Sequence, residues 1–170
     1  MMYVFAILAV FFLGMQCIDA LVNFLFSVRL KKGFFSSSDR VSVLIPARNE
    51  EKKIGLLLEQ LILNKNIYEI LIYNDESTDQ TSRVVQDFQK KDSRITLIQG
   101  FSLPKGWLGK NHACDALSKR AQGNYLLFLD ADVILYDDLI EDVLFYLKTK
   151  RHSLVSLFPV QILKTFGEKA

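Results

Sequence analysis

The chain has 170 residues, of which 50% are hydrophobic and 24% are charged, a composition of folded rather than disordered proteins. Its 21 Lys and Arg residues against 19 Asp and Glu residues give a net charge of +2, so nothing in the charge predicts a nucleic-acid partner. The two cysteines, Cys17 and Cys114, argue against a disulfide scaffold and fit a reducing compartment.

Residues 1–28 are far more apolar than the rest of the chain. They contain no Lys or Arg and a single acid, Asp19, and as a helix they would span roughly 42 Å, against ~30 Å for the hydrocarbon core of a bilayer. A signal peptide would need a basic start and a small-residue cleavage site, and a buried core helix would need a polar face; Met1–Met15 has none of these. The sequence therefore predicts a single-pass transmembrane anchor over residues 1–28.

Basic residues follow this segment and none precedes it. Arg29, Lys31 and Lys32 begin a basic, Ser-rich stretch over residues 29–40, which we interpret as a linker. By the positive-inside rule, the rest of the chain is expected on the cytoplasmic side of the cell membrane.

Beyond the linker, short apolar runs alternate with segments that carry the apolar stripe of a helix. Strands are predicted at Val41–Ile45, Tyr68–Tyr73, Ile95–Gln99, Tyr125–Leu129 and Leu154–Phe158. Helices are predicted at Glu50–Leu63, Thr78–Lys90, Asn111–Ala121 and Asp137–Leu147. This alternation over short connections predicts the α/β fold class, with a mostly parallel sheet and helices on both faces.

Polar residues gather after three of these strands, at Pro46–Glu51, Asn74–Asp79 and Asp130–Asp132. In parallel α/β sheets, ligands bind beyond the carboxyl ends of the strands, near the point where the strand order reverses. Loops are polar in any protein, but three acidic strand ends exceed what that alone explains. We therefore expect a binding site at this edge of the sheet.

Asp130 and Asp132 are separated by one residue and follow an apolar strand. In an extended chain, residues two apart project to the same side, so their carboxylates could hold Mg²⁺ or Mn²⁺ that also bridges substrate phosphates. The alternative is a pair of ordinary turn or helix-capping aspartates, and the spacing alone leaves both open.

The segment Asn74–Asp79 also has two interpretations. Ser77 or Thr78 could cap the helix that follows, with Asp79 in its first turn. That reading leaves Asp75, at the strand end, without a role, and Asp75 could accept hydrogen bonds from a base or a ribose.

The segment Gly106–Lys110 precedes a predicted helix. Its glycines would let the backbone approach a ligand, and the helix N-terminus together with Lys110 favours phosphate, although the spacing is not that of a P-loop. Shortly afterwards, His112 and Cys114 are interpreted as ordinary helix residues rather than as a nucleophile pair.

Four segments in order, PARNEE (46–51), NDESTD (74–79), GWLGKNHAC (106–114) and FLDADV (128–133), resemble the family 2 glycosyltransferases of the GT-A fold. The resemblance covers residues 41–133. The third segment, together with an N-terminal membrane helix, is similar to the membrane-associated branch that includes carotenoid-acid and hopanoid-associated glycosyltransferases.

The resemblance implies a nucleotide-sugar-binding domain over residues 41–170 and a role for each candidate residue. Pro46, Ala47 and Glu50 would line the donor nucleotide pocket. Asp75 would contact the nucleotide base, which in this family is usually uracil.

The same resemblance implies that Lys110 lies near the donor diphosphate. Asp130 and Asp132 correspond to the D-x-D motif of the family, with Asp132 as the direct ligand of Mn²⁺ or Mg²⁺, and Asp130 serving both the metal and the ribose and sugar. The chain departs from the family pattern at Asn74, where many members have Asp, and at Glu76, where many have Gly.

Family members transfer a sugar from a nucleotide diphosphate to an acceptor hydroxyl with inversion at the anomeric carbon. The metal neutralises charge on the leaving diphosphate, and a separate carboxylate acts as general base. The resemblance thus implies hexosyltransferase activity with a UDP-sugar donor, and the predicted anchor suggests a lipid-linked acceptor.

The general base of the family normally lies well downstream of the D-x-D motif. The later acids of this chain do not match that motif; they are Asp137, Asp138, Glu141, Asp142 and Glu168. The catalytic base is therefore unassigned, and we expect an incomplete, donor-binding half of the enzyme, with little or no transfer by the 170 residues alone.

Other classes of protein remain as alternatives. A membrane-anchored interaction module could keep the fold without catalysis, and it would show no metal-dependent nucleotide binding. A dinucleotide-binding protein should carry G-x-G-x-x-G after the first strand, where PARNEE has no glycine. A phosphohydrolase with a nucleophilic aspartate would leave Asp75 and the Gly-Lys loop unexplained.

Overall fold

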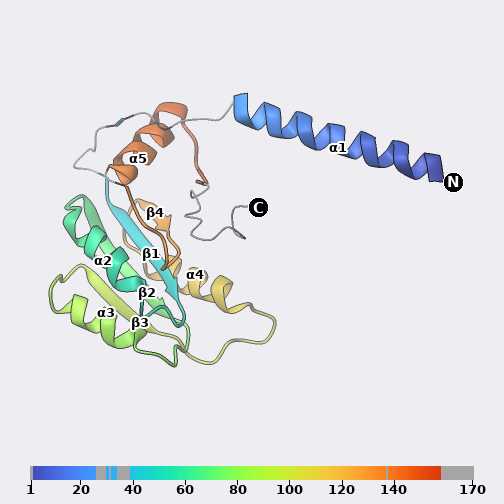
Figure 1. Cartoon of the computed structure of the whole chain (residues 1–170). Helices are drawn as coiled ribbons and strands as arrows, with labels where there is room; N and C mark the ends of the chain where they lie inside the picture. Colours follow the sequence, from blue (N-terminus) through green and yellow to red (C-terminus); the bar gives the residue numbers. More distant parts are fainter. Residues whose placement is uncertain (1, 26–29, 31, 34–38, 137, 158–170) are drawn as a thin grey trace. The chain divides into compact units, whose positions relative to one another are not determined.

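The computed structural model describes residues 2–25, 30, 32–33, 39–136 and 138–157. The chain divides into two units, residues 1–31 and residues 32–170 (Figure 1). The first contains the helix α1 (Met2–Leu25), whose stretch Tyr3–Leu25 has a mean hydropathy of 2.2 and is long and apolar enough to cross a membrane. Residues 26–28 of the predicted anchor, and most of the predicted linker 29–40, lie outside the described residues.

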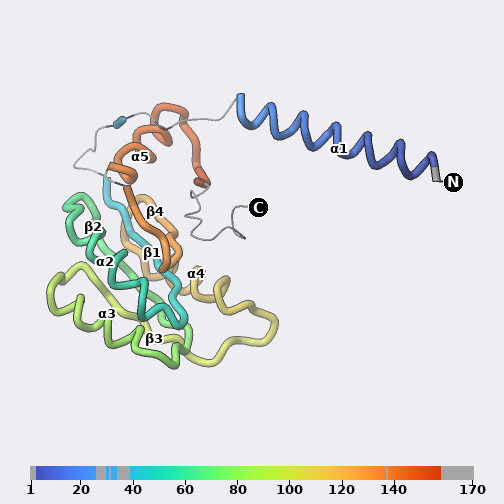
Figure 2. The backbone as a smooth tube through the Cα atoms, viewed as in Figure 1, coloured from blue at the N-terminus to red at the C-terminus, as the bar shows by residue number. Residues whose placement is uncertain are grey.

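The second unit is built on four parallel strands in the order β3-β2-β1-β4. The strands are β1 (Val41–Ala47), β2 (Ile67–Asn74), β3 (Ile95–Gln99) and β4 (Tyr125–Phe128). The helices are α2 (Ile54–Leu63), α3 (Thr81–Gln89), α4 (Gly109–Arg120) and α5 (Leu139–Lys150). The predicted α/β fold class is confirmed, and Figure 2 traces the alternation along the backbone.

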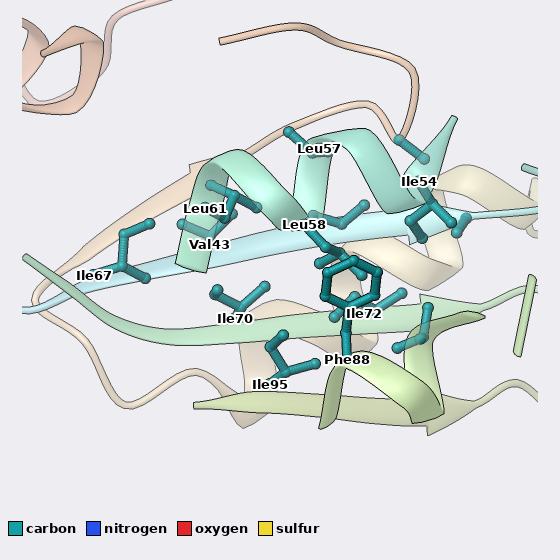
Figure 3. Packing of buried hydrophobic residues seen from close by; sticks show 14 of the residues in the cluster. Val43, Ile54, Leu57, Leu58, Leu61, Ile67, Ile70, Ile72, Phe88 and Ile95 are labelled. Atoms are coloured by element: carbon teal, nitrogen blue, oxygen red, sulfur yellow. The ribbon is translucent and has the colours of Figure 1, made fainter. Parts of the chain in front are cut away.

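Both faces of the sheet are covered at β1 and β2, where successive residues are buried on opposite sides, whereas Leu126 and Phe128 of β4 are 44% and 47% exposed. Val43 and Ile45 of β1 belong to the larger apolar cluster, which α2, α3 and α5 complete. Figure 3 shows Val43 packed in this cluster with residues of α2 and with Phe88 of α3. Leu44 of β1 belongs to a second cluster with Ala113 and Leu117 of α4. Two-sided burial explains why β1 and β2 appear in the sequence as nearly continuous apolar runs.

The strand order places the reversal point beside β1. The chain passes from β1 to β2 and β3 on one side, and then returns to form β4 on the other side of β1. In sheets of this kind the ligand crevice lies at the carboxyl ends of the two strands that flank the reversal, here β1 and β4.

The predicted strand Leu154–Phe158 is wrong for its described part, because residues 154–157 are not in a strand and Phe158 lies outside the described residues. Leu154 is 85% exposed, and an apolar run forms a strand only where a neighbouring strand or a core surface receives it. The last helix runs three residues beyond its prediction, to Lys150, where Lys148 and Lys150 suit the helix C-terminus. Its predicted first residue, Asp137, lies outside the described residues.

Candidate functional site

A cleft of about 450 Å³ opens at the carboxyl ends of β1 and β2, bounded by the start of α4 and the loop after β4. Its lining is Pro46, Ala47, Arg48, Glu50, Asp75, Gly109, Lys110, Ala113, Asp130, Ala131 and Asp132. The structure thus brings all seven sequence-predicted site residues to one cleft at the reversal point of the sheet. These residues come from the end of β1 and the loop after it, the loop after β2, the first turn of α4 and the loop after β4, and they are up to 86 positions apart in the chain, from Pro46 to Asp132.

Three acids of the cleft are each paired with a base from another loop or helix. Lys110 Nζ donates to Asp130 Oδ1 at 2.5 Å, and Lys53 Nζ donates to Asp132 Oδ2 at 3.1 Å. Arg48 Nη1 lies 3.4 Å from Asp75 Oδ2. The side chain of Asp75 is only 14% exposed, whereas those of Asp130 and Asp132 are about half exposed, at 56% and 48%.

The two lysines remain cationic under physiological conditions. The hydrogen bond to Asp130 raises the pKa of Lys110 above its ordinary value, and the hydrogen bond to Asp132 raises the pKa of Lys53 in the same way. The cleft and its rim therefore carry ammonium groups suited to phosphate and carboxylates suited to a divalent cation. A bound phosphate would replace a carboxylate as the partner of a lysine, and a bound cation would replace a lysine as the partner of a carboxylate.

The backbone of Asp130–Asp132 is not extended, so the predicted extended geometry is wrong, although both residues line the same cleft. Ala131 and Asp132 lie in a turn, and Val133 N donates to Asp130 O at 3.3 Å. Ala131 is buried at 4% exposure, which fixes the turn at the end of β4. The turn lets the two carboxylates reach lysines from different parts of the fold while both line the cleft.

Gly109 begins α4 directly against Asp75. A Cβ atom built at Gly109 would lie 2.6 Å from Asp75 Oδ2, so a larger residue there cannot coexist with the observed position of the carboxylate. The first turn of α4, with its unpaired N–H groups and Lys110, faces the same cleft. Such a helix start is suited to phosphate.

The loops after β1 and β2 are joined by reciprocal hydrogen bonds, a set of contacts that the sequence does not predict. Asn49 N donates to Ser77 Oγ at 3.0 Å, and Thr78 N donates back to Asn49 Oδ1 at 2.8 Å. Similarly, Glu51 N donates to Asp79 Oδ2 at 3.1 Å. The contacts hold the cleft residues Arg48 and Glu50 in place because they fix the backbone on either side.

These contacts correct the interpretation of Ser77 and Thr78 as helix caps. α3 begins at Thr81, and its N-cap residue, Gln80, makes no side-chain capping bond. Asp79 does accept from Thr81 N at 3.0 Å, as a residue in the approach to a helix can. Ser77 and Thr78 serve the neighbouring loop instead.

The departures from the family pattern at positions 74 and 76 have distinct local consequences. Asn74 is 5% exposed, and its Nδ2 donates to Ser82 Oγ at 2.7 Å and to Gln99 Oε1 at 2.8 Å. Its amide therefore ties the loop after β2 to α3 and β3. Glu76 has a φ of 52°, in the left-handed region that favours glycine.

Replacing Glu76 with Gly is expected to stabilise the protein by about 0.5–1 kcal/mol. The left-handed backbone costs an L-residue roughly 1–2 kcal/mol, which exceeds the extra entropy that glycine loses on folding. Glu59→Gly is the matched control, because Glu59 is exposed within α2 and its replacement should destabilise by about 1 kcal/mol. Urea unfolding of both variants measures the two shifts, and a loss of stability in Glu76→Gly would contradict the strain.

His112 and Cys114 do not form a nucleophile pair. Burial raises the pKa of the Cys114 thiol, which keeps it protonated and weakly nucleophilic. His112 Nδ1 lies 3.3 Å from Tyr73 Oη, and its ring meets that of Trp107 edge to face at 5.7 Å. The interpretation of both as residues of a helix is confirmed for α4.

The sequence profile described as Glycosyl transferase family 2 matches residues 42–169. The chain belongs to this family. It is similar to 4,4'-diaponeurosporenoate glycosyltransferase of Staphylococcus aureus (strain USA300), with 36% identity over 131 residues, which is 75% of this chain and 34% of the relative. The chain therefore spans about a third of the length of that relative.

Solved structures give the fold. The crystal structure of Staphylococcus aureus TarS residues 1–349 in complex with UDP has 28% identity and a TM-score of 0.55, over 66% of this chain and 33% of that one. The mannosyltransferase PcManGT of Pyrobaculum calidifontis, solved with GDP-Man and Mn²⁺, has 22% identity and a TM-score of 0.53, over 71% of this chain and 35% of that one. The parallel sheet of this family 2 chain is thus of the GT-A type, as its four motifs predict.

Sequence reasoning missed two members of the family 2 cleft and its surroundings. Arg48 pairs with Asp75, and Lys53 pairs with Asp132. Basic residues in a polar loop form no distinctive sequence pattern, so neither pairing could be predicted. For Arg48, its place within the first motif was the signal available. For Lys53 there was none, since its partner lies 79 residues away.

Proposed function

We propose that this chain is the donor-binding part of an inverting, metal-dependent glycosyltransferase that uses a UDP-sugar. The observation that carries the proposal is the meeting of Asp75, Lys110, Asp130 and Asp132 in one cleft at the reversal point of the sheet. The UDP bound to TarS, which shares the fold and 28% of the aligned residues, supports the choice of nucleotide.

Each part of the donor has a matching surface in the cleft. Asp75, mostly buried at the end of β2, accepts from the N–H of the base, and Pro46, Ala47 and Glu50 form the adjoining wall. The first turn of α4 and Lys110 receive the diphosphate, for which Lys110 exchanges Asp130 for a phosphate oxygen. Asp130 is then free to bond the ribose and sugar hydroxyl groups.

Asp132 and Asp130 would hold the divalent cation, Mn²⁺ or Mg²⁺. Among the residues that the structure describes, no group of three or more His, Cys, Asp or Glu side chains is placed to hold a metal ion. Two carboxylates nevertheless fit a hard cation that takes its remaining ligands from water and substrate phosphates. When bound, such a cation neutralises the charge that builds on the leaving diphosphate.

Lys53 competes with that cation for Asp132, because its ammonium already bonds Asp132 Oδ2. Replacing Lys53 with Met is therefore expected to tighten Mn²⁺ binding in the presence of UDP by up to about fivefold, a modest change because both side chains are half exposed. Lys52→Met is the control for a general change in charge, since Lys52 is an exposed neighbour on the same turn. Electron paramagnetic resonance of free Mn²⁺ measures both, and an equal effect in the two variants would refute direct competition.

Transfer of the sugar also needs a general base and an acceptor. Asp75, Asp130 and Asp132 are engaged in ion pairs and assigned to the donor and the metal, so we assign none of them as the base. We expect the 170 residues to bind donor without transferring sugar at enzymatic rates. With α1 as a cell-membrane anchor and the domain on the cytoplasmic side, a lipid-linked acceptor would lie within reach.

Equilibrium dialysis of the chain with UDP-glucose, UDP and UMP tests the donor site. Because Lys110 and the start of α4 are assigned to the diphosphate, UDP should bind more tightly than UMP, by roughly 10-fold or more for a charge-assisted phosphate contact. A membrane-anchored interaction module that keeps the fold would bind none of the three. Equal affinity for UDP and UMP would contradict the assignment of Lys110.

A further inference from the structure

The loop between β3 and α4 exposes a concentration of large apolar side chains. Phe101 is 80% exposed, Leu108 is 71% exposed, and Leu103 and Trp107 are 43% and 42% exposed. All four fall within eight consecutive residues, 101–108, which we call the apolar loop. Exposed apolar side chains gathered in this way are typical of interaction surfaces, whereas single ones are not.

The apolar loop is held in place by the domain behind it. Trp107 N donates to Pro104 O at 3.2 Å, which closes a turn through Gly106, whose φ of 88° requires glycine. The Trp107 ring packs edge to face on His112, which in turn lies within 3.3 Å of Tyr73 Oη. One side of the Trp107 side chain thus packs on the domain, and the rest of it is exposed to solvent.

Within the apolar loop the charge is positive. Residues 101–108 contain Lys105 and no acidic residue, whereas Lys110, beyond the loop, is paired with Asp130. Lys105 is exposed within the loop itself. A surface with apolar side chains, a tryptophan and an exposed lysine matches the boundary between acyl chains and anionic headgroups, where tryptophan is enriched and a nearby lysine is attracted to the surface.

We propose that the apolar loop docks on a lipid bilayer, with Phe101, Trp107 and Leu108 entering the interface and Lys105 among anionic headgroups. The same chain carries the helix Tyr3–Leu25, which is long and apolar enough to cross a membrane. If this helix anchors the chain, a bilayer is the apolar surface nearest to the loop. This inference rests on the proposed membrane anchor and is independent of sugar transfer. Gly109 and Lys110 of the cleft follow the loop directly, so docking sets the mouth of the cleft at headgroup level.

Trp107 is the sole tryptophan of the chain, and its fluorescence therefore reports on the apolar loop alone. The full chain is reconstituted in vesicles of phosphatidylcholine and phosphatidylglycerol, with or without phosphatidylcholine brominated on its acyl chains. We expect the bromolipid to quench the fluorescence of Trp107 and acrylamide to quench it poorly. We also expect the emission maximum of Trp107 to lie at a shorter wavelength than in the unfolded chain.

A double variant, Phe101→Ser with Leu108→Ser, should lose most of the quenching by bromolipid. The control is Leu63→Ser, since Leu63 is equally apolar and 80% exposed at the end of α2, outside the loop. Co-flotation with the vesicles tests the anchor separately, and failure to float would overturn both proposals. Co-flotation with Trp107 unquenched by bromolipid would overturn the docking alone, and shielding from both quenchers would indicate that protein covers the loop instead.

Discussion

Replacing Asp132 with Asn is expected to remove the metal dependence of UDP binding and to weaken Mn²⁺ binding by more than about 100-fold. Loss of a residue that only supports a metal ligand costs about 10–100-fold, and loss of a charged ligand itself should exceed that. Glu50 and Asp75 also line the cleft, but among the described residues no group of three or more His, Cys, Asp or Glu side chains is placed to hold a metal ion and so to compensate for the loss. The affinity of Mn²⁺ in the presence of UDP, measured by electron paramagnetic resonance, gives the effect.

The matched control for this variant is Asp138→Asn. Asp138 is exposed, lies six residues further along and is not part of the cleft lining. Its φ of 64° is one that Asn adopts readily, so the change should leave the fold intact. Retention of Mn²⁺ affinity by Asp132→Asn, or an equal loss in both variants, would contradict the role of Asp132.

Replacing Gly109 with Ala is expected to weaken UDP binding by about 10- to 100-fold while changing the stability of the fold little. Alanine favours a helix over glycine by up to about 1 kcal/mol, which offsets strain at the start of α4. The new Cβ would lie 2.6 Å from Asp75 Oδ2 and would displace this carboxylate, which we assign to binding the nucleotide base. The expected loss is that of one hydrogen bond to a charged group.

Gly55→Ala separates this effect from helix propensity. A Cβ at Gly55, inside α2, would lie 3.6 Å from Val84 and 3.8 Å from Phe88, which is ordinary contact. This variant should gain up to about 1 kcal/mol in stability and bind UDP as the unchanged chain does. Calorimetry measures the UDP affinity of both variants, and urea unfolding measures their stability. Unchanged UDP affinity in Gly109→Ala would show that the position of Asp75 is not required.

Local patterns in the sequence were sufficient to predict most of the fold. The strand Ile95–Gln99 has the predicted bounds, and β1 and β2 differ by one or two residues at their ends, because two-sided burial makes each strand a dense apolar run. The meeting of Asp75 and Asp130 in one cleft was predictable for a related reason. Each stands at the carboxyl end of a parallel strand, and those ends share one edge of the sheet.

Contacts between distant loops could not be predicted in the same way. The pairing of Lys53 with Asp132 and the bonding of Asn49 to Ser77 and Thr78 depend on how two loops approach each other, which no spacing along the chain encodes. The turn at Asp130–Asp132 depends on the burial of Ala131, a small residue without a marked preference for turns. The missing strand at Leu154 shows that an apolar run needs a partner to become a strand.

The most direct test of the donor site is a calorimetric titration of the 170-residue chain, held in detergent micelles, with UDP in the presence and absence of Mn²⁺. GDP serves as the comparison nucleotide. The proposed UDP-sugar site, formed by Asp75, Lys110, Asp130 and Asp132, predicts UDP binding that is strengthened by Mn²⁺ and exceeds that of GDP. A folded sample that binds neither nucleotide, or binds UDP equally well without Mn²⁺, would contradict a metal-dependent donor site in this cleft.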